Sequence, residues 1–306
     1  MKSSTDSIRT RVYAKVNLAL SVGGVIRASG ENNDGLHPIC SWMHAINLCD
    51  EIEIHRLRSD EDSNYAVGWA ICGSPDLPAD WDLDRDLAAR MHRVVEDHIG
   101  EKLPVSMRVS KSIPAGGGLG GGSADAAGVL LGLNELFGLD LDYTELVQIA
   151  IKLGSDIPFF IDPEHTIPRP AVVEGIGDQI TRLGRVHEGT PITLFFPQFG
   201  CHTGEVYQAF DVLIDNDPKH TLQTDRIKEI SSRSLITSHD LFNDLATPAA
   251  KVAPALGDIL EMIHQSVGKP VHVSGSGSTL YVIGGIESEL TLDPQGRYSV
   301  VSTHLC

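Results

Sequence analysis

Six glycines fall within the seven positions 116–122 of this 306-residue chain, and this run constrains the fold more than any other feature. So dense a run permits backbone conformations that other residues avoid, and it lets a bound group touch the main chain. A strand pattern at Pro104–Ser110 precedes the run, and helical spacing follows it from Ser123. Because the run is held between a strand and a helix, we expect a defined loop there and not a flexible linker.

The junction between the glycine run and the predicted helix suits an anion. Successive backbone amides in a glycine run form a concave nest, and a helix N-terminus carries about half a positive charge. Phosphate groups are typical ligands of such junctions. Ser123 and Asp125 are predicted to cap the helix, and Gly138 is predicted to end it.

The P-loop of nucleotide-binding proteins is one template for such a loop. Gly117 and Gly122 have its spacing, but Ser123 stands where the template requires Lys. The P-loop interpretation fails on that residue.

The dinucleotide-binding pattern Gly-x-Gly-x-x-Gly is a second template, and Gly116, Gly118 and Gly121 satisfy it. In that fold the helix leads into a strand that ends in an acidic residue. Here a second helix is predicted at Asp142–Leu153 instead. A Rossmann oxidoreductase therefore stays a minor alternative.

The rest of the chain shows both strand and helix patterns. One or two strands are predicted at Ile8–Leu20, and further strands at Asp50–Leu57, Ala171–Val173, Ile192–Phe196 and Leu280–Ile283. A loop is predicted at Arg27–Gly35. Helices are predicted at Leu87–His98, at Asp142–Leu153 with a capping box, near Gly204–Ile214 and at Ala249–Val267. A change of character near Val186–Thr190 predicts two domains, residues 1–187 and 188–306.

Charge and cysteine content exclude several classes of protein. Lys plus Arg is 24 and Asp plus Glu is 41, so the net charge of −17 argues against a nucleic-acid or anionic membrane partner. Much of the acidic excess lies in Ser59–Asp86, which we expect to be a solvated surface excursion. Five scattered cysteines without a Cys-x-x-Cys pair, and an N-terminus without an apolar signal segment, predict a cytoplasmic protein with reduced thiols.

The segment Pro114–Ala127 resembles the phosphate loop of the GHMP kinase superfamily. Four other segments agree with that superfamily in order and context: Ala14–Leu18, Asp34–His37, Leu153–Phe160 and Ser274–Leu280. The resemblance spans about residues 10–285. Within the superfamily the segments are most similar to the kinases that act on 4-diphosphocytidyl-2-C-methyl-D-erythritol.

The resemblance implies an α+β fold in two domains. The N-terminal domain would be like ribosomal protein S5 domain 2, and the C-terminal domain would be ferredoxin-like. The active site is expected in the cleft between them. The oligomeric state is left open.

The implied activity is the ATP-dependent phosphorylation of the 2-hydroxyl of that small-molecule substrate, which carries a cytidine diphosphate group, in non-mevalonate isoprenoid biosynthesis. By resemblance Asp156 is the catalytic base, Lys15 is its electrostatic partner, and ATP and Mg²⁺ are the cofactors. The residues implied to hold the nucleotide are Pro114, Gly116, Gly117, Gly118, Gly120, Gly121, Gly122 and Ser123, with Asp86 near the adenine side. Ser123 is also the implied metal ligand.

The resemblance also implies residues that bind the acceptor. His37 would read the cytosine edge, Tyr207 would close one side of the base, and Asn17 shares a strand face with Lys15. Leu36 departs from the family, which usually has Tyr there. Gly275 and Ser276 would approach the substrate, and Asn243 and Asp244 match a family signature to which we assign no role.

Two further alternatives remain open. Leu36 motivates a related kinase that acts on another small alcohol, such as mevalonate or homoserine. A catalytically silent nucleotide-binding protein is the other, although the presence of both Lys15 and Asp156 argues against it.

Overall fold

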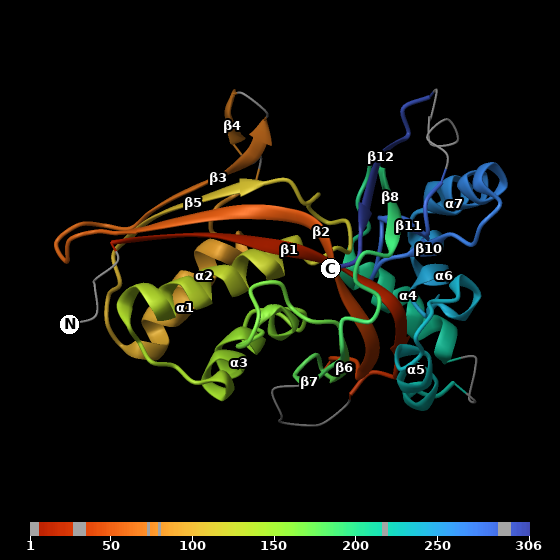
Figure 1. Cartoon of the computed structure of the whole chain (residues 1–306), viewed down its shortest axis with the longest axis horizontal. Helices are drawn as coiled ribbons and strands as arrows, with labels where there is room; N and C mark the ends of the chain where they lie inside the picture. Colours follow the sequence, from red (N-terminus) through yellow and green to blue (C-terminus); the bar gives the residue numbers. More distant parts are fainter. Residues whose placement is uncertain (1–5, 27–34, 72–73, 79–80, 216–219, 287–294) are drawn as a thin grey trace. The chain divides into compact units, whose positions relative to one another are not determined.

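A computed structural model describes residues 6–26, 35–71, 74–78, 81–215, 220–286 and 295–306 (Figure 1). Its strands are β1 (Ser7–Val22), β2 (Ile39–Arg56), β3 (Asn64–Ile71), β4 (Ser74–Pro78), β5 (Val105–Lys111), β6 (Ala171–Gly175), β7 (Gln179–Arg182), β8 (Pro191–Pro197), β9 (Phe242–Asn243), β10 (His272–Val273), β11 (Leu280–Ile283) and β12 (Tyr298–His304). Its helices are α1 (Leu87–Ile99), α2 (Gly121–Phe137), α3 (Tyr143–Ile151), α4 (Thr203–Ile214), α5 (Thr224–Ser231), α6 (Ala246–Val252) and α7 (Pro254–Val267), with short 3-10 turns η1 (Ile157–Phe160) and η2 (Ser238–Asp240).

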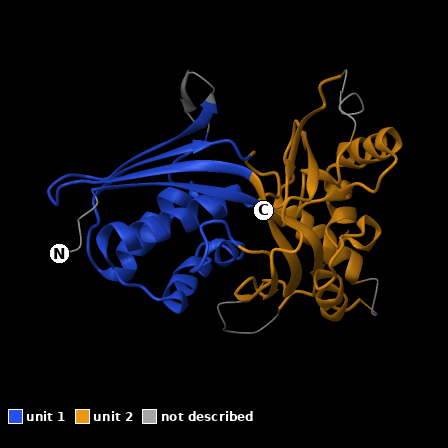
Figure 2. Ribbon diagram, in the orientation of Figure 1, with its two compact units in different colours: residues 1–14, 48–113, 120–168 blue, residues 15–47, 114–119, 169–306 orange. Residues whose placement is uncertain are grey.

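The chain groups into two compact units (Figure 2). Unit 1 comprises residues 1–14, 48–113 and 120–168, and unit 2 comprises residues 15–47, 114–119 and 169–306. Strands β1 and β2 each contribute residues to both units. The chain passes from one unit to the other at several points, none of which is the predicted boundary between residues 187 and 188. The division into domains 1–187 and 188–306 stays a prediction.

Unit 1 is a sheet with helices α1, α2 and α3 on one side of it (Figure 1). The strand order is β4-β3-β5-β2-β1, with β5 antiparallel to β2 and parallel to β3. Val105, Met107 and Val109 of β5 are fully buried while the residues between them are not, as the alternation predicts.

Helix α2 lies very close to this sheet because two of its residues are glycines. A Cβ at Gly128 would meet Val12 Cγ1 at 2.5 Å and Ile52 Cδ1 at 2.8 Å, and one at Gly132 would meet Ile54 at 2.9 Å. Nearly the whole circumference of α2 is buried. The helix that follows the glycine run is therefore a fixed element of the core.

Unit 2 holds the remaining lengths of β1 and β2 and a second sheet. In unit 2, β9 pairs with β1 in the parallel direction, β6 pairs with β2 in the antiparallel direction, and β7 pairs with β6. The second sheet has the order β10-β11-β8-β12 with antiparallel pairs. Phe195 of β8 and Tyr281 of β11 are among its largest fully buried side chains.

Most predicted elements are confirmed, including the residue at which α2 ends and the residue at which α3 begins. Gly138 ends α2 in a left-handed conformation (φ 62°). Asp142 and Glu145 form the predicted capping box at the start of α3.

Three predictions of secondary structure were wrong in part. The helix predicted at Ala249–Val267 is two helices, because Pro254 is tolerated in a first turn but not inside a helix. The strand predicted at Asp50–Leu57 is the second half of β2, whose first half is buried on both faces and so shows no alternation. The acidic stretch Ser59–Asp86 contributes β3 and β4 to the sheet, and the loop predicted at residues 27–35 falls almost wholly outside the described residues.

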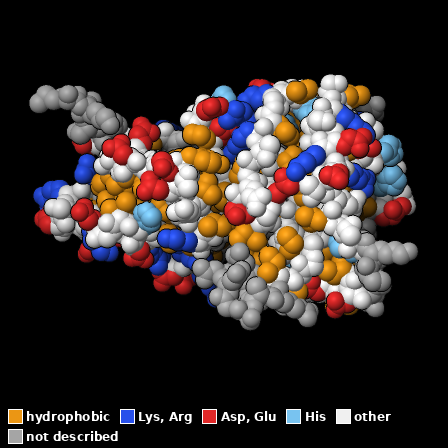
Figure 3. Space-filling view, turned by 90° about the horizontal axis from the view of Figure 1, so that it is seen from below, with side chains coloured by type: hydrophobic (Ala, Val, Ile, Leu, Met, Phe, Trp, Pro, Cys, Tyr) orange, Lys and Arg blue, Asp and Glu red, His pale blue; other side chains and the backbone are white. Residues whose placement is uncertain are grey.

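Charge is dispersed over the face seen in Figure 3, where acidic side chains are scattered among basic ones. Among the described residues, no helix has both the length and the apolar character that a membrane crossing requires. Cys40, Cys49, Cys201 and Cys306 are free thiols.

Candidate active site

The glycine loop has a regular backbone alternation. Gly116, Gly118 and Gly120 have φ angles of 71°, 74° and 69°, whereas the intervening Gly117 and Leu119 have negative φ. A run of left-handed residues at alternate positions is a backbone pattern that can turn amides toward one concave side, and we refer to this loop as the nest. Around Gly116 there is open space, because a Cβ there would meet nothing within 4 Å.

Two of the glycines are required by packing within the protein. A Cβ at Gly118 would lie 2.1 Å from the carbonyl oxygen of Ser274, and one at Gly117 would lie 2.7 Å from Thr279 Oγ1. The amide of Thr279 donates to the Gly117 carbonyl at 3.1 Å, and the Ser274 hydroxyl donates to the Gly118 carbonyl at 3.0 Å. The loop is therefore seated on the second glycine-rich segment, Ser274–Thr279.

Lys15 holds the same loop from β1. Its amide donates to the Leu119 carbonyl at 2.9 Å, and its Nζ donates to the Gly118 carbonyl at 3.1 Å and to Asn17 Oδ1 at 2.7 Å. Lys15 and Asn17 are each only 2% exposed. The predicted shared face of these two residues is confirmed, and a buried ammonium group lies against the nest.

The second glycine-rich segment is held by a residue to which sequence reasoning gave no role. Asn243 Nδ2 donates to the carbonyls of Val273 (2.8 Å) and Gly275 (2.7 Å), and its Oδ1 accepts from the Leu245 amide. Its neighbour Asp244 accepts from Ser21 Oγ and from the Val22 amide. The only signal in the sequence was the match of Asn243 and Asp244 to a family signature, which carries no geometry.

Gly275 and Ser276 lie within this segment. Gly275 has a φ of 55°, and a Cβ there would meet the Gly118 carbonyl oxygen at 3.2 Å. Ser276 is buried, and its hydroxyl lies 2.9 Å from Thr203 Oγ1. A cavity of about 260 Å³ adjoins the glycine loop and is lined by Pro114, Ala115, Gly117, Phe196–Gly200, Ser278 and Thr279.

Comparisons with known proteins identify the family of the chain. Residues 86–162 match the model of the GHMP kinases N terminal domain. A 4-diphosphocytidyl-2-C-methyl-D-erythritol kinase of a Geobacter species is 33% identical over 272 residues, which cover 88% of this chain and 86% of that protein. The chain belongs to this kinase family. The same-named protein of Polynucleobacter asymbioticus is 30% identical and covers 92% of the chain and 85% of its own length.

Solved structures of the GHMP kinases share the fold. A crystal structure of 4-(cytidine 5'-diphospho)-2C-methyl-D-erythritol kinase has a TM-score of 0.69 at 26% identity, and it covers 97% of this chain and 99% of its own. A crystal structure of L. major mevalonate kinase in complex with R-mevalonate has a TM-score of 0.66 at 12% identity and covers 98% of both chains. The α+β GHMP kinase fold expected from the sequence is confirmed.

Asp156 lies in unit 1, directly before η1. It is half-buried, with backbone angles of −86° and −16°, and its side chain does not cap η1. Lys15 lies in unit 2. The pairing of Lys15 with Asp156 that the family resemblance implies stays a prediction.

The residues predicted for the cytidine end of a substrate of this family are brought together in unit 2. The His37 and Tyr207 rings have centroids 4.9 Å apart, and His37 Nδ1 lies 2.9 Å from the Gly23 carbonyl, to which it must donate. His37 Nε2 lies 3.6 Å from Asp211 Oδ1, a buried oxygen without a hydrogen-bond partner among the described residues. Leu36 is 42% exposed. Sequence reasoning did not identify Asp211, because helical spacing alone does not show which side chain faces a histidine far away in the chain.

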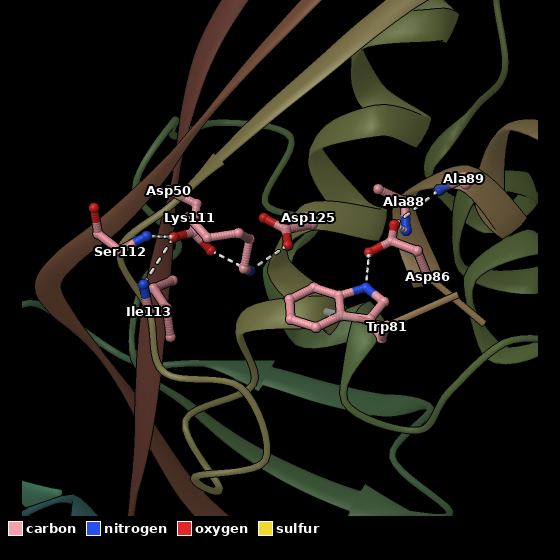
Figure 4. A network of polar contacts seen from close by, with 9 residues as sticks. All are labelled: Asp50, Trp81, Asp86, Ala88, Ala89, Lys111, Ser112, Ile113 and Asp125. Carbon is pink, nitrogen blue, oxygen red and sulfur yellow. Dashed lines mark hydrogen bonds and ion pairs between the residues drawn. The ribbon is translucent and has the colours of Figure 1, made fainter. Parts of the chain in front are cut away.

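Asp86 has a structural role that the sequence reading did not foresee. Its Oδ1 accepts from the amides of Ala88 and Ala89 and so caps α1, and its Oδ2 accepts from Trp81 Nε1 at 3.0 Å (Figure 4). Both carboxylate oxygens are thereby occupied. A contact of Asp86 with the adenine nucleotide stays a prediction.

The predicted capping of α2 was wrong. The N-cap is Gly120, which has no side chain to offer, and Asp125 instead accepts a hydrogen bond from Lys111 Nζ at 2.5 Å. Lys111 also donates to Asp50, so that one buried ammonium lies between two buried carboxylates (Figure 4). Glycine supplies the left-handed turn into this helix, which a Ser or Asp at the cap would adopt only at a cost.

The electrostatics of this cluster follow from its charge count. Two carboxylates and one ammonium leave a buried excess of negative charge, and burial raises the pKa of Asp125 against the attraction of Lys111. Burial works against the Lys111 ammonium, but the two carboxylates outweigh it and its pKa is raised. Asp50 also accepts hydrogen bonds from the amides of Ser112 and Ile113.

Proposed function

We propose that this chain is an ATP-dependent kinase that phosphorylates the 2-hydroxyl of 4-diphosphocytidyl-2-C-methyl-D-erythritol in non-mevalonate isoprenoid biosynthesis. The observation that carries the proposal is the left-handed alternation at Gly116–Gly120, seated on Ser274–Thr279, in a chain of this kinase family. Neutral amides and a helix end can hold phosphate in a protein whose net charge is −17.

In this proposal the chain's contribution to phosphoryl transfer is positioning and electrostatic stabilisation, as is usual for kinases. The amides of the nest and the first turn of α2 hold the nucleotide phosphates. Lys15 offsets negative charge on the transferred phosphoryl group. Asp156 accepts the proton as the substrate oxygen bonds to the γ-phosphorus, and ADP leaves as the β–γ bond breaks.

Mg²⁺, when bound, would neutralise charge on the phosphates. The described residues hold no group of three or more His, Cys, Asp or Glu side chains placed for a metal ion. That fits an ion held mainly by nucleotide phosphates and water, with one or two protein ligands. Ser123, half-buried in the first turn of α2, is the hydroxyl that we assign to it.

His37 and Tyr207 support a pyrimidine-bearing acceptor. Their rings already lie against each other, and His37 is held in one orientation by the Gly23 carbonyl. A base placed there would gain aromatic contact, while the neighbouring Leu36, where the family usually has Tyr, is exposed.

The acceptor is tested by measuring ADP release from ATP with a panel of alcohols: 4-diphosphocytidyl-2-C-methyl-D-erythritol, mevalonate and homoserine. We expect turnover with the first and none above background with the others. Preferential turnover of mevalonate or homoserine would overturn the assigned acceptor but leave the kinase activity standing.

The base is tested by Asp156→Asn, which removes the charge and keeps the shape. We expect ATP binding to persist and kcat to fall by at least about 100-fold, the low end for general acid–base catalysis. Asp142→Asn is the matched control, since it changes an aspartate in the same unit that only caps α3. Near-normal turnover of the Asp156 variant removes that residue from the role.

A further inference from the structure

Both ends of the glycine loop are tied to one buried side chain. The chain leaves β5 at Lys111 and enters α2 at Gly121, and the loop lies between these points. Lys111 Nζ reaches forward to Asp125 in α2 at 2.5 Å and also donates to Asp50 on β2. The side chains of these three residues are at most 4% exposed.

Asp50 extends the tie to the backbone. Its Oδ1 accepts from the amides of Ser112 at 2.5 Å and Ile113 at 2.8 Å, the two residues between Lys111 and the loop (Figure 4). The last residues before the loop are therefore held by Asp50, and the helix after the loop is held by Asp125. Lys111 joins the two carboxylates.

The two loop ends also touch directly. A Cβ at Gly121 would lie 2.8 Å from Ile113 Cγ2 and 3.5 Å from Lys111 Nζ. Any larger residue at position 121 would require Ile113 to shift. The packing of Gly121 against Ile113 and the ion pairs of Lys111 with Asp50 and Asp125 are independent observations. Both indicate that the two ends of the loop are held close together.

Resting on the kinase function proposed above, we propose that Lys111, Asp50 and Asp125 are positioning residues that hold the ends of the glycine loop together, so that its amides are fixed for phosphate before ATP arrives. None of the three needs to touch the nucleotide. A loop with free ends would have to be ordered at each binding event, and that ordering would weaken ATP binding. The arrangement predicts an effect on KM for ATP, with a smaller effect on kcat.

The sharpest test compares two substitutions at one position. Asp125→Ala removes the acceptor in α2 but leaves Lys111 paired with Asp50, so that one positive and one negative charge remain. Because Ala favours a helix, the substitution does not disturb the backbone of α2. Asp125→Asn removes the charge and keeps an acceptor oxygen for Lys111. Lys102→Met is the control for breaking an ion pair elsewhere in unit 1, since Lys102 is 85% exposed and pairs with Glu96.

We expect KM for ATP to rise at least about 10-fold in Asp125→Ala, the order expected when a hydrogen bond to a charged group is lost. In Asp125→Asn, which keeps an acceptor oxygen for Lys111, we expect KM for ATP to stay within about 3-fold of the parent value. We expect the same in Lys102→Met, which leaves the whole cluster intact. A role limited to the stability of α2 would lower the unfolding midpoint and leave KM unchanged.

Hydrogen exchange without ATP measures the loop apart from any activity. Amides of residues 115–123 should exchange at least about 10-fold faster in Asp125→Ala than in the parent, in Asp125→Asn or in Lys102→Met. The exchange rates of amides in β8 and α7 should be the same in all four proteins. Parent-like exchange and KM in Asp125→Ala would overturn the proposal. If the loop exchanges faster in Asp125→Ala than in the parent but the parent phosphorylates no acceptor, the positioning role is supported and the proposed kinase function is defeated instead.

Discussion

At the scale of single residues, the glycines of the loop divide by what surrounds them. Gly118 has the Ser274 carbonyl oxygen 2.1 Å from the place of its missing Cβ, whereas Gly116 has nothing within 4 Å. Both have positive φ, at 74° and 71°. Glycine at 118 is thus required by a neighbouring segment, and glycine at 116 is required by conformation alone.

We predict that Gly118→Ala lowers the free energy of unfolding by at least about 2 kcal/mol, because a left-handed residue costs roughly 1–2 kcal/mol and the Ser274 backbone must also shift. Gly116→Ala, with the conformational cost alone, should lose about 1 kcal/mol. Urea unfolding of the two variants beside the parent measures both. Equal losses would show that the loop is not seated as closely as the Gly118 contact requires.

His44 gives a second prediction at this scale. Burial lowers the pKa of His44 to about 4, and His187 and Arg185 add repulsion. The folded protein therefore keeps His44 neutral, while the unfolded chain binds a proton below about pH 6.5. Stability from this residue is complete above that pH and is lost as the pH falls toward 4.

We expect the free energy of unfolding to fall by about 2 kcal/mol from this residue between pH 7 and pH 5, at 1.36 kcal/mol per pKa unit. Urea titrations at the two pH values measure it. His44→Phe should reduce the slope and not abolish it, since burial also lowers the pKa of His187. An unchanged slope in the variant would contradict the assignment to His44.

At the scale of elements, α3 shows how a short helix is fixed by its ends. The Asp142 side chain accepts from the Glu145 amide at 2.9 Å, and the Glu145 carboxylate accepts from the Asp142 amide at 3.0 Å. The helix has nine residues, a length that is marginal in isolation. The cap and the packing of Leu146 and Ile149 compensate for that length.

Asp142→Ala should therefore cost about 1 kcal/mol of stability, the usual loss for a removed N-cap. Asp142→Asn should restore most of it, because an amide oxygen also accepts the bond. Chemical unfolding of both variants measures the difference. If Asn and Ala behave alike, the cap contributes nothing and tertiary packing alone holds α3.

The elements also show what the sequence could and could not predict. Alternation in β5, the capping box of α3 and the terminator at Gly138 are local signals, so they were read correctly. The first half of β2 has no local signal, since its side chains are buried on both faces.

The candidate site divides in the same way. The glycine loop was predicted from residue type and spacing, and Lys15 from the family resemblance; the structure places Lys15 in contact with the loop. Asn243 and Lys111 were not predicted, because their roles depend on partners 32 and 61 positions away in the chain. A single sequence carries no record of such partners.

At the scale of the whole molecule, the net charge and the glycine loop act on an anionic nucleotide in opposite directions. A net charge of −17 repels anionic nucleotides at long range, whereas the nest and Lys15 attract phosphate only over short distances. Salt screens the long-range part first.

We therefore predict that kcat/KM for ATP rises, by about 2-fold, when the ionic strength is raised from about 20 to about 150 mM. Steady-state rates at fixed free Mg²⁺ measure this. A fall over the same range would mean that the local positive potential, and not the net charge, governs the approach of ATP.

The seating of Gly118 on Ser274 also bears on how the protein is made. The two residues are 156 positions apart, so a ribosome releases the glycine loop long before it makes the segment that supports it. During that interval the Gly118 carbonyl lacks the Ser274 hydroxyl, and the Gly117 carbonyl lacks the Thr279 amide. The growing chain therefore acquires this supported form of the loop only after the segment Ser274–Thr279 has been made.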